Sequence, residues 1–436
     1  MLELVKEAVD NIERSNERIK MPELGEKDII ADLHIHSKYS RATSKDLDIE
    51  NLVKWARIKG VNMLGTGDFT HPIWLKELKE KLKEDKGILW YEDEKGKFPF
   101  ILSSEISLIF SQEGKGRRVH LVFLAPSFEV VDKINCFLDN KGRRDYDGRP
   151  IFGISCIDFV MEMRNISKDI EIIPAHIWTP WFGVFGSKGG FYDLEKAFGD
   201  QKQYIHAIET GISSDPEMNW RVKDLENISI ISFSDLHSFW PWRLAREATI
   251  FNGDIEEISY KDILEQIRNN SFKATIETEP SYGKYHWDGH RNCGFSCAPE
   301  KTEELKGICP KCNKSLIVGV ESGIKKRADL PVGSLPSKAK PFFKILPLHE
   351  LIAFYLECGI NTKKVWEIYN NLIEKFGNEF NILLKIDRGE LIKALPNNEK
   401  LVQLIIDNRI ANLKIQPGYD GEYGKIVLKE NQSKLF

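Results

Sequence analysis

Apolar residues follow two patterns between residues 29 and 276. Short unbroken apolar runs predict buried strands at residues 29–36, 61–67, 100–110, 119–125, 170–175, 205–209 and 228–233. Apolar residues three or four apart predict helices at residues 47–59, 74–83, 128–138, 156–164 and 260–269. Because strands and helices alternate, the pattern predicts parallel βα units. About seven such units close more naturally into a barrel than into an open sheet.

The pattern of apolar residues changes after residue 280. Residues 281–322 are rich in Gly, Cys and His, and prolines then space out a linker. Helical spacing runs from residue 348 to about 409, before strand spacing returns at 412–428. Residues 1–20 have the spacing of a charged amphipathic helix. We therefore predict an N-terminal helical extension (1–27), an α/β barrel (28–280), a cysteine-bearing module (281–322) and a helical C-terminal domain (323–436).

Composition narrows the class of protein. The chain has 436 residues, 42% of them hydrophobic and 29% charged, which fits two or three globular domains. Its apolar runs fall short of the ~20 residues that a membrane span needs, and no signal peptide is evident. We expect a cytoplasmic protein without a membrane partner. The net charge of −4 argues against a generally basic nucleic-acid coat protein but leaves room for a local basic groove.

Histidines and acidic residues follow several of the predicted strands. His34 and His36 lie two apart on a strand, so both rings project from one face, and Asp235 and His237 repeat this spacing. The candidate metal ligands are His34, His36, Asp68, His71, Glu105, His120, His176, Asp235 and His237. Imidazole and carboxylate groups bind catalytic zinc, manganese or iron, and barrels build active sites at strand ends. We predict a multinuclear metal hydrolase in which Glu105 bridges two metals, and we interpret His206 as a core residue.

Four of the seven cysteines cluster at Cys293, Cys297, Cys309 and Cys312. Paired thiolates across short loops satisfy one tetrahedral zinc ion, which would be structural because no position is left open. Two disulfides are the alternative, and the lack of a secretion signal disfavours them. His286 and His290 lie just upstream, either as variant ligands or as residues that contact phosphate or pack.

The order H-x-H, Gly-Asp, a strand-end Glu, two single histidines and D-x-H resembles the PHP (polymerase and histidinol phosphatase) family over residues 29–277. The resemblance implies a distorted (β/α)7 barrel with two or three divalent metals. One stretch departs from the family, because Gly67-Asp68-Phe69 and then His71 replace a Thr-Asp-His triplet. Asp68, His71 or both complete the site. The acidic or His residue usual after H-x-H is also missing near Ser40.

A PHP-like barrel followed by a cysteine module and a helical domain resembles the endonuclease Q family. Residues 32–44 and 283–290 carry the most distinctive similarity. The resemblance implies nicking of damaged DNA, double- or single-stranded, on the 5′ side of hypoxanthine, uracil, xanthine and abasic sites. It also implies barrel metals (Zn, Mn, Mg or Fe), one structural zinc and a DNA-binding C-terminal domain.

The residues themselves suit phosphodiester hydrolysis. Asp235, Glu105 and His237 are the predicted catalytic residues, with Asp235 orienting the attacking water as a general base. Reading a base within a duplex requires flipping it into a pocket. The loop after His176 offers the aromatic residues Trp178, Trp181, Phe182 and Phe185, either as a wedge and base-stacking surface or as a cap over the barrel mouth. Lys188, Ser213 and Ser214 are candidate DNA contacts.

Two other functions stay open at this stage. A small-molecule phosphoesterase of the histidinol-phosphatase kind would need only the barrel. A non-catalytic DNA- or clamp-binding module would hold its metals for structure alone. Residues 432–436 resemble part of a sliding-clamp peptide of Q-x-x-L type, but the aromatic pair of such peptides is missing, which favours chance occurrence.

Overall fold

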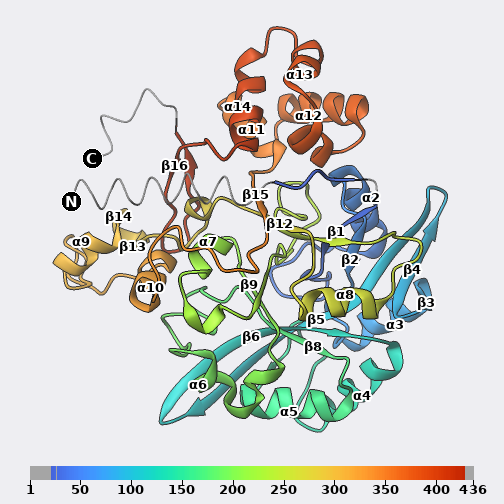
Figure 1. The fold of residues 1–436 in the computed structure, drawn as a ribbon, viewed down its shortest axis with the longest axis vertical. Helices are drawn as coiled ribbons and strands as arrows, with labels where there is room; N and C mark the ends of the chain where they lie inside the picture. The colour runs from blue at the N-terminus through green and yellow to red at the C-terminus, as the bar shows by residue number, and fades with distance from the viewer. Residues whose placement is uncertain (1–20, 26, 428–436) are drawn as a thin grey trace.

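The computed structural model describes residues 21–25 and 27–427 (Figure 1). The N-terminal helix expected at residues 1–20 and the clamp-like peptide at 432–436 therefore lie outside the described residues. Within the described part of the chain, no helix is long and apolar enough to cross a membrane.

Strands dominate the first two thirds of the chain, and helices dominate the last third. The strands are β1 (Asp28–Asp32), β2 (Met63–Gly65), β3 (Lys83–Asp85), β4 (Ile88–Asp93), β5 (Gly96–Gln112), β6 (Lys115–Ala125), β7 (Ile151–Phe152), β8 (Glu171–Pro174), β9 (Ala207–Glu209), β10 (Ser229–Ile231), β11 (Ala248–Asn252), β12 (Ala274–Glu277), β13 (Asp288–His290), β14 (Phe295–Cys297), β15 (Phe342–Lys344), β16 (Ile415–Gln416) and β17 (Lys425–Ile426). The α-helices are α2 (Ile49–Lys59), α3 (Pro72–Lys81), α4 (Phe128–Asp139), α5 (Cys156–Ile166), α6 (Leu194–Phe198), α7 (Pro216–Asn219), α8 (Tyr260–Arg268), α9 (Pro299–Glu304), α10 (Val320–Arg327), α11 (Leu348–Tyr355), α12 (Lys363–Phe376), α13 (Arg388–Ala394) and α14 (Glu399–Arg409).

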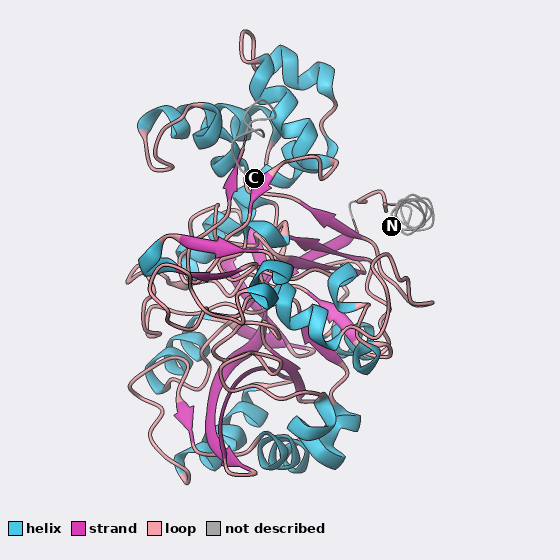
Figure 2. Cartoon of the chain, turned by 90° about the vertical axis from the view of Figure 1, so that its left-hand side faces the viewer, coloured by secondary structure: helices cyan, strands magenta, loops and turns pink. Residues whose placement is uncertain are grey.

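Seven strands close into a ring, as the distorted (β/α)7 barrel predicts. β1 pairs with β2, β2 with β5, β5 with β6, and β6 with β8. A backbone hydrogen bond from Ile177 to Glu209 joins the ends of β8 and β9, and β9 pairs with β10. A bridge between Ile35 and Leu236 then returns to the segment after β1. Helices cover the outside of these strands (Figure 2).

The strands are not all parallel, which differs from the sequence prediction. β5 and β6 form an antiparallel hairpin, because Glu113 and Gly114 both adopt positive φ (51° and 72°) in the tight two-residue turn between them. β11 lies antiparallel between β1 and β12, and the β3–β4 hairpin extends the sheet beyond β5. The apolar pattern did not predict β3, β4, β11 or β12 as strands.

The predicted helices form because their ends are capped by polar residues. The Asp48 side chain accepts a hydrogen bond from the Asn51 amide at the start of α2, which ends at Gly60 with φ of +94°. Ser259 and Asp262 form a reciprocal capping box at the start of α8. Stable helices on the outside fix the strands beneath them.

The C-terminal helices are joined to the barrel. β15 pairs in parallel with β12, so part of the segment predicted as a linker belongs to the main sheet. Helices α11–α14 form the group at the top of Figure 1. The chain then returns beside the cysteine-bearing module, where Trp287 forms a bridge with Tyr419.

Candidate functional site

Six of the nine predicted metal ligands converge: four follow β1, β8 or β10, and Glu105 and His120 lie within β5 and β6. The ligand atoms of His34, His36, Glu105 and Asp235 lie within 4.8 Å of one another, and so do those of Glu105, His120 and His176. Glu105 on β5 belongs to both groups. A carboxylate shared in this way could serve both groups, and its predicted bridging of two metals stays a prediction.

The two oxygens of Glu105 divide between the groups. Oε2 lies 3.4 Å from Nε2 of His34 and 3.1 Å from Nε2 of His36. Oε1 lies 2.7 Å from Nδ1 of His120 and 3.3 Å from Nε2 of His176. Oδ1 of Asp235 completes the first group, 3.2 Å from Nε2 of His36.

The donor set fits divalent metal ions. Nε2 of His34 is buried and has no hydrogen-bond partner among the residues that the structure describes. A buried unpaired nitrogen costs free energy unless something binds it, and it faces two carboxylates. Mixed imidazole and carboxylate ligands suit zinc, manganese or iron.

Asp68 supports the site from behind a ligand and belongs to neither group, unlike the sequence prediction. Its Oδ1 accepts a hydrogen bond from Nδ1 of His36 at 2.9 Å. Its Oδ2 accepts from the amide and hydroxyl of Ser37 and from the hydroxyl of Ser40. With both oxygens occupied in this way, Asp68 orients His36 so that Nε2 points to the metal position.

His71 also lies outside both groups. Its ring stacks on Tyr39 with centroids 4.5 Å apart, and the residue immediately precedes α3. Its Nδ1 is buried and has no hydrogen-bond partner among the described residues. Neither Asp68 nor His71 is in the two ligand groups, and Asp68 contacts His36, which is a member of one.

Asp235 and His237 form the open side of the site. Each side chain is 32% exposed, whereas those of His34, His36 and Glu105 are buried. His237 belongs to neither ligand group, but its ring lies 4.7 Å from that of His36. Its Nδ1 donates to the Asp235 carbonyl at 2.9 Å, which leaves Nε2 with a free lone pair.

Electrostatics keep the carboxylates ionised. Burial alone would raise the pKa of Glu105, but His120, Arg149 and His34 hold it well below its usual range. Burial would likewise raise the pKa of Asp235, yet His237 and the hydrogen bond from His36 lower it strongly. Burial lowers the pKa of His120 to about 4, although Glu105 opposes this. The protein therefore presents anionic oxygens beside a neutral imidazole, as cation binding requires.

Arg149 is a site residue that the sequence analysis missed. Its Nη1 donates to Oε2 of Glu105 at 3.0 Å, and 23% of its side chain is exposed. It lies in the loop before β7 rather than after an apolar strand, so the strand-end pattern could not find it. Its guanidinium gives the open side of the site a positive charge.

The aromatic loop after His176 divides into buried and exposed members. Trp178 and Phe185 are core residues, and Nε1 of Trp178 donates to Asn219, so the predicted wedge or stacking role does not suit them. Phe182 stacks on His120 with centroids 4.1 Å apart and covers that ligand. Trp181 is 39% exposed. Lys188 is exposed too, and both face solvent as a DNA contact must.

Three other sequence interpretations change. Ser213 and Ser214 are buried, and the Ser214 hydroxyl donates to the Thr210 carbonyl, so neither presents its side chain to DNA. His206 is not a core residue, because its ring is partly exposed and pairs with Glu171 at 2.9 Å. The alternation along a single strand did not reveal the pairing of His206 with Glu171, which lies on β8.

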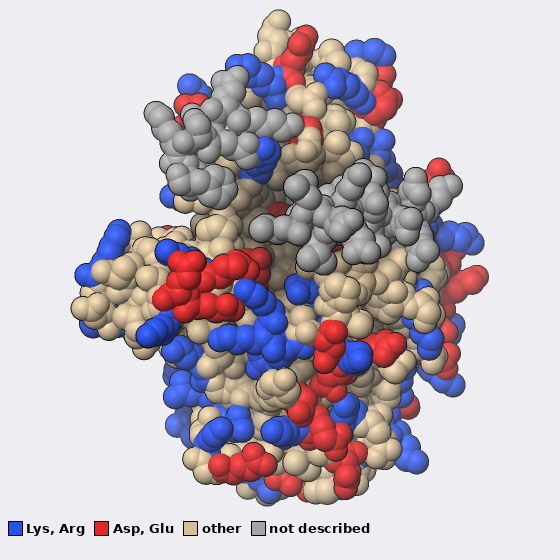
Figure 3. Space-filling view, turned by 60° about the vertical axis from the view of Figure 1, so that its left-hand side comes forward, with Lys and Arg blue, Asp and Glu red and all other residues tan. Residues whose placement is uncertain are grey.

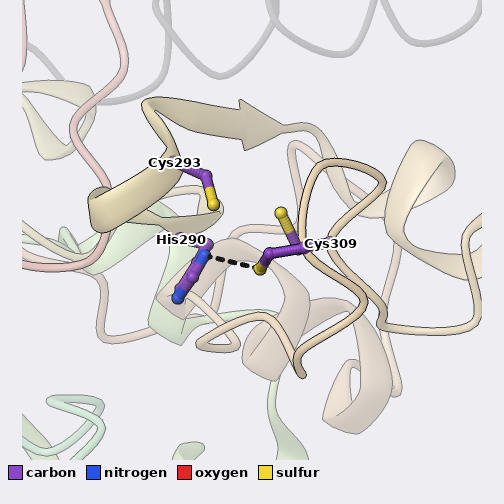
Figure 4. Close-up of side chains that lie close together, drawn as sticks. His290, Cys293 and Cys309 are labelled. Carbon is purple, nitrogen blue, oxygen red and sulfur yellow. Dashed lines mark hydrogen bonds between the residues drawn. The ribbon is translucent and has the colours of Figure 1, made fainter.

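The cysteine-bearing module holds a second candidate metal site. The ligand atoms of His290, Cys293, Cys309 and Cys312 lie within 4.8 Å of one another, and Figure 4 shows the labelled side chains turned toward a common point. Nδ1 of His290 lies 3.3 Å from the Cys312 sulfur. Burial opposes ionisation of Cys309, but backbone N–H groups of Lys311 and Cys312 lower its pKa to about 7. Three thiolates and one imidazole suit structural zinc.

Cys297 lies outside that group, in contrast to the predicted four-cysteine set. In the β13–β14 hairpin Phe295 pairs with His290, and Cys297 pairs with Asp288. Cys297 is therefore two residues farther from the turn, ~7 Å along the strand. Its sulfur lies 3.3 Å from the Thr302 hydroxyl instead. The sequence had left His290 open as a variant ligand, and the geometry favours it.

Comparisons with known proteins agree with this architecture. A family model described as the MJ0043 C-terminal domain matches residues 347–410. The protein MJ0043 of Methanocaldococcus jannaschii is 32% identical over 301 residues, which are 68% of this chain and 36% of that protein. The chain thus spans about a third of the length of this relative.

Two solved structures match nearly the whole chain. The lesion-specific endonuclease Q of Pyrococcus furiosus has a TM-score of 0.81 and 29% identity, covering 94% of this chain and 97% of that one. An endonuclease Q in complex with a 27-mer duplex substrate, which has an abasic lesion at the active site, has a TM-score of 0.81 and 30% identity, covering 92% and 97%. On this full-length similarity, the chain belongs to the endonuclease Q family.

Proposed function

We propose that this protein is a DNA repair endonuclease. It would hydrolyse the phosphodiester bond on the 5′ side of deaminated bases (hypoxanthine, uracil or xanthine) and of abasic sites. The observation that carries the proposal is the match, over 92% of the chain, to an endonuclease Q with an abasic lesion at its active site. The barrel (28–280) would be catalytic, residues 281–322 would hold structural zinc, and residues 323–436 would contribute to DNA binding.

The metal-binding groups support hydrolysis at this site. Two or three divalent cations bound at the two groups that share Glu105 would activate a water molecule and neutralise phosphoryl charge. Asp235 lies on the open side, where its ionised carboxylate would orient the attacking water. Nε2 of His237 is free to bind metal or to accept a proton. Arg149, whose Nη1 donates to Glu105, would contact a phosphoryl oxygen.

Surface features support DNA as the substrate. Lys and Arg side chains gather in the middle of the face drawn in Figure 3, next to a group of Asp and Glu side chains. Such a patch attracts phosphate groups although the net charge of the chain is −4. Trp181, exposed on the loop that covers His120, is the remaining aromatic candidate for stacking on a flipped base.

End-labelled duplexes provide the test. Purified protein with Mg²⁺ or Mn²⁺ would be incubated with duplexes that carry one deoxyinosine, one deoxyuridine, one abasic site or no lesion. We expect a single nick 5′ of each lesion that Asp235→Ala and Glu105→Gln abolish. His206→Gln is the matched control, because His206 is a strand-flanking histidine that pairs with Glu171 outside the site. It should nick like the wild type.

Other outcomes identify the alternatives. Hydrolysis of p-nitrophenyl phosphate without any nick in DNA would indicate a small-molecule phosphoesterase. Tight binding to damaged DNA without turnover under any divalent metal would indicate a non-catalytic module. Within the same assay, Arg149→Met should lower kcat ~10²–10³-fold, the range seen when one donor to a developing charge is removed. Arg143→Met, which removes an exposed arginine paired with Asp145, is its control.

A further inference from the structure

Glu209 is a fully buried carboxylate that touches both metal-ligand groups and belongs to neither. It is the last residue of β9. Its two oxygens lie 2.9 and 3.1 Å from Nδ1 of His34. Oε2 also accepts a hydrogen bond from the backbone amide of His176 at 2.7 Å. His34 serves the first group and His176 serves the second.

The contact with His34 fixes which ring nitrogen is free. A carboxylate only accepts hydrogen bonds, so Nδ1 of His34 must carry the proton. Nε2 then keeps its lone pair, and this is the buried nitrogen that has no hydrogen-bond partner in the described structure. It points toward Oε2 of Glu105, 3.4 Å away, where the metal is expected.

The contact with His176 supports an unusual backbone. His176 has a φ of +30°, in the left-handed region that a non-glycine residue seldom adopts. Gly211 packs directly against it, and a Cβ at that position would come within 2.6 Å of the His176 Cβ. The hydrogen bond to Glu209 pairs the amide of this strained residue and holds its ring toward Oε1 of Glu105.

We propose that Glu209 is a positioning residue that holds one ligand of each metal, His34 through its ring and His176 through its backbone. The inference rests on the proposed metal-dependent function. Asp68 does this for His36 alone. Since Glu209 reaches both groups, it couples the geometry of the two metal positions, and its loss should weaken both.

Glu209→Gln is the informative substitution. The amide oxygen must face the N–H of His176, which places the NH₂ group beside Nδ1 of His34. The NH₂ group of Gln and the Nδ1–H of His34 would then be two donors facing each other. If His34 moves its proton to Nε2 instead, that proton occupies the nitrogen that would bind the metal. Glu209→Asp keeps an acceptor-only group that is one methylene shorter. It should serve only one of the two histidines and weaken binding less than Gln does.

Glu277→Gln is the matched control. Glu277 is also fully buried, but it accepts hydrogen bonds from the hydroxyls of Thr210, Ser232 and Thr275. Burial raises its pKa, which favours the neutral form. These hydroxyl groups can rotate to accept hydrogen bonds as well as to donate them. The side-chain amide of Gln can therefore replace the carboxyl group of Glu277. We expect metal binding by Glu277→Gln to equal that of the wild type.

Metal binding is measured on the protein without DNA. Mn²⁺ titration followed by electron paramagnetic resonance gives affinity and stoichiometry, and Co²⁺ absorption reports coordination geometry. We expect Glu209→Gln to bind Mn²⁺ ~10–100-fold more weakly, the usual effect of losing a group that orients a ligand. Its nicking rate should recover at high Mn²⁺. Circular dichroism confirms folding, and if Gln does not fold, Glu209→Asp must show the smaller, rescuable loss.

Two results would overturn the inference. One is Mn²⁺ affinity in a folded Glu209→Gln or Glu209→Asp that equals the wild type. The other is an equal loss in Glu277→Gln, which would indicate a general effect of changing buried carboxyls. Failure of the proposed function is distinguishable from failure of this inference. In that case the wild-type protein would bind two metals and yet nick no DNA.

Discussion

A buried ion pair joins the C-terminal helices to the barrel, and removing its cation should loosen this joint. Nζ of Lys59, at the end of α2, lies 2.7 Å from Oε1 of Glu379 and donates to the Pro241 carbonyl. Glu379 also accepts from the Tyr369 hydroxyl and the Leu348 amide, both at 2.9 Å. Lys59 and Glu379 are fully buried.

The magnitude follows from the charge left behind. In Lys59→Met the carboxylate of Glu379 stays buried without a counter-ion, which costs ~3–5 kcal/mol when one partner of a buried pair is removed. Two remaining donors to Glu379 place the expected loss near the lower end, ~3 kcal/mol. In the double variant Lys59→Met/Glu379→Gln no charge remains. Its stability should return to within ~1–2 kcal/mol of the wild type.

Urea-induced unfolding followed by tryptophan fluorescence measures this loss. Trp242 and Trp366 flank His349 beside the ion pair and report on the joint. Lys76→Met, which breaks an exposed helical pair with Glu80, is the control and should change stability by less than ~0.5 kcal/mol. A loss below ~1 kcal/mol in Lys59→Met, or a double variant as unstable as the single one, would refute the reasoning.

Two further predictions concern pH and zinc. Burial, aided by Lys59, lowers the pKa of His349 from 6.5 to about 3. The unfolded chain therefore binds a proton that the folded chain does not, so the stability due to neutral His349 is complete above pH 6.5 and is lost as pH falls toward 3. At pH 5 the loss is ~2 kcal/mol, and His349→Phe should flatten this acid slope in urea unfolding at several pH values; an unchanged slope would contradict it. For zinc, Cys293→Ser should lose the metal and Cys297→Ser should keep it, as measured by colorimetric zinc release. Equal loss of zinc from both variants would indicate that all four cysteines bind the metal.

The sequence predicted those parts of the site that follow from strand geometry. Residues that are two apart on a strand project from one face, which is how the sequence predicted His34 and His36 as ligands. The structure brings the carboxylate of Asp235 into the same group. Glu105 was predicted to bridge two metals because it follows a strand and has two oxygens, and each oxygen lies beside a different ligand group. These inferences need only local periodicity and the common end of a barrel.

Residues that act across the ring could not be found in this way. Glu209 and Arg149 contact ligands from other strands, so no spacing along the chain links them to the site. Trp178 and Phe185 look like a surface loop by composition, but the chain folds them into the core. Cys297 has the spacing of a zinc ligand, yet the register of its hairpin moves it away.

Several residues of the site have a strained backbone, and buried hydrogen bonds support it. Asp68, His176 and Asp235 all have positive φ, at 46°, 30° and 50°, and each immediately follows a strand or its extension. Such conformations cost ~1–3 kcal/mol each and persist only where the surroundings fix them. Asp68 is held by hydrogen bonds from Ser37 and Ser40, and His176 is held by Glu209. The buried acceptors thus offset the strain that turns the ligands inward, and positioning of the metals and folding of the barrel mouth depend on the same hydrogen bonds.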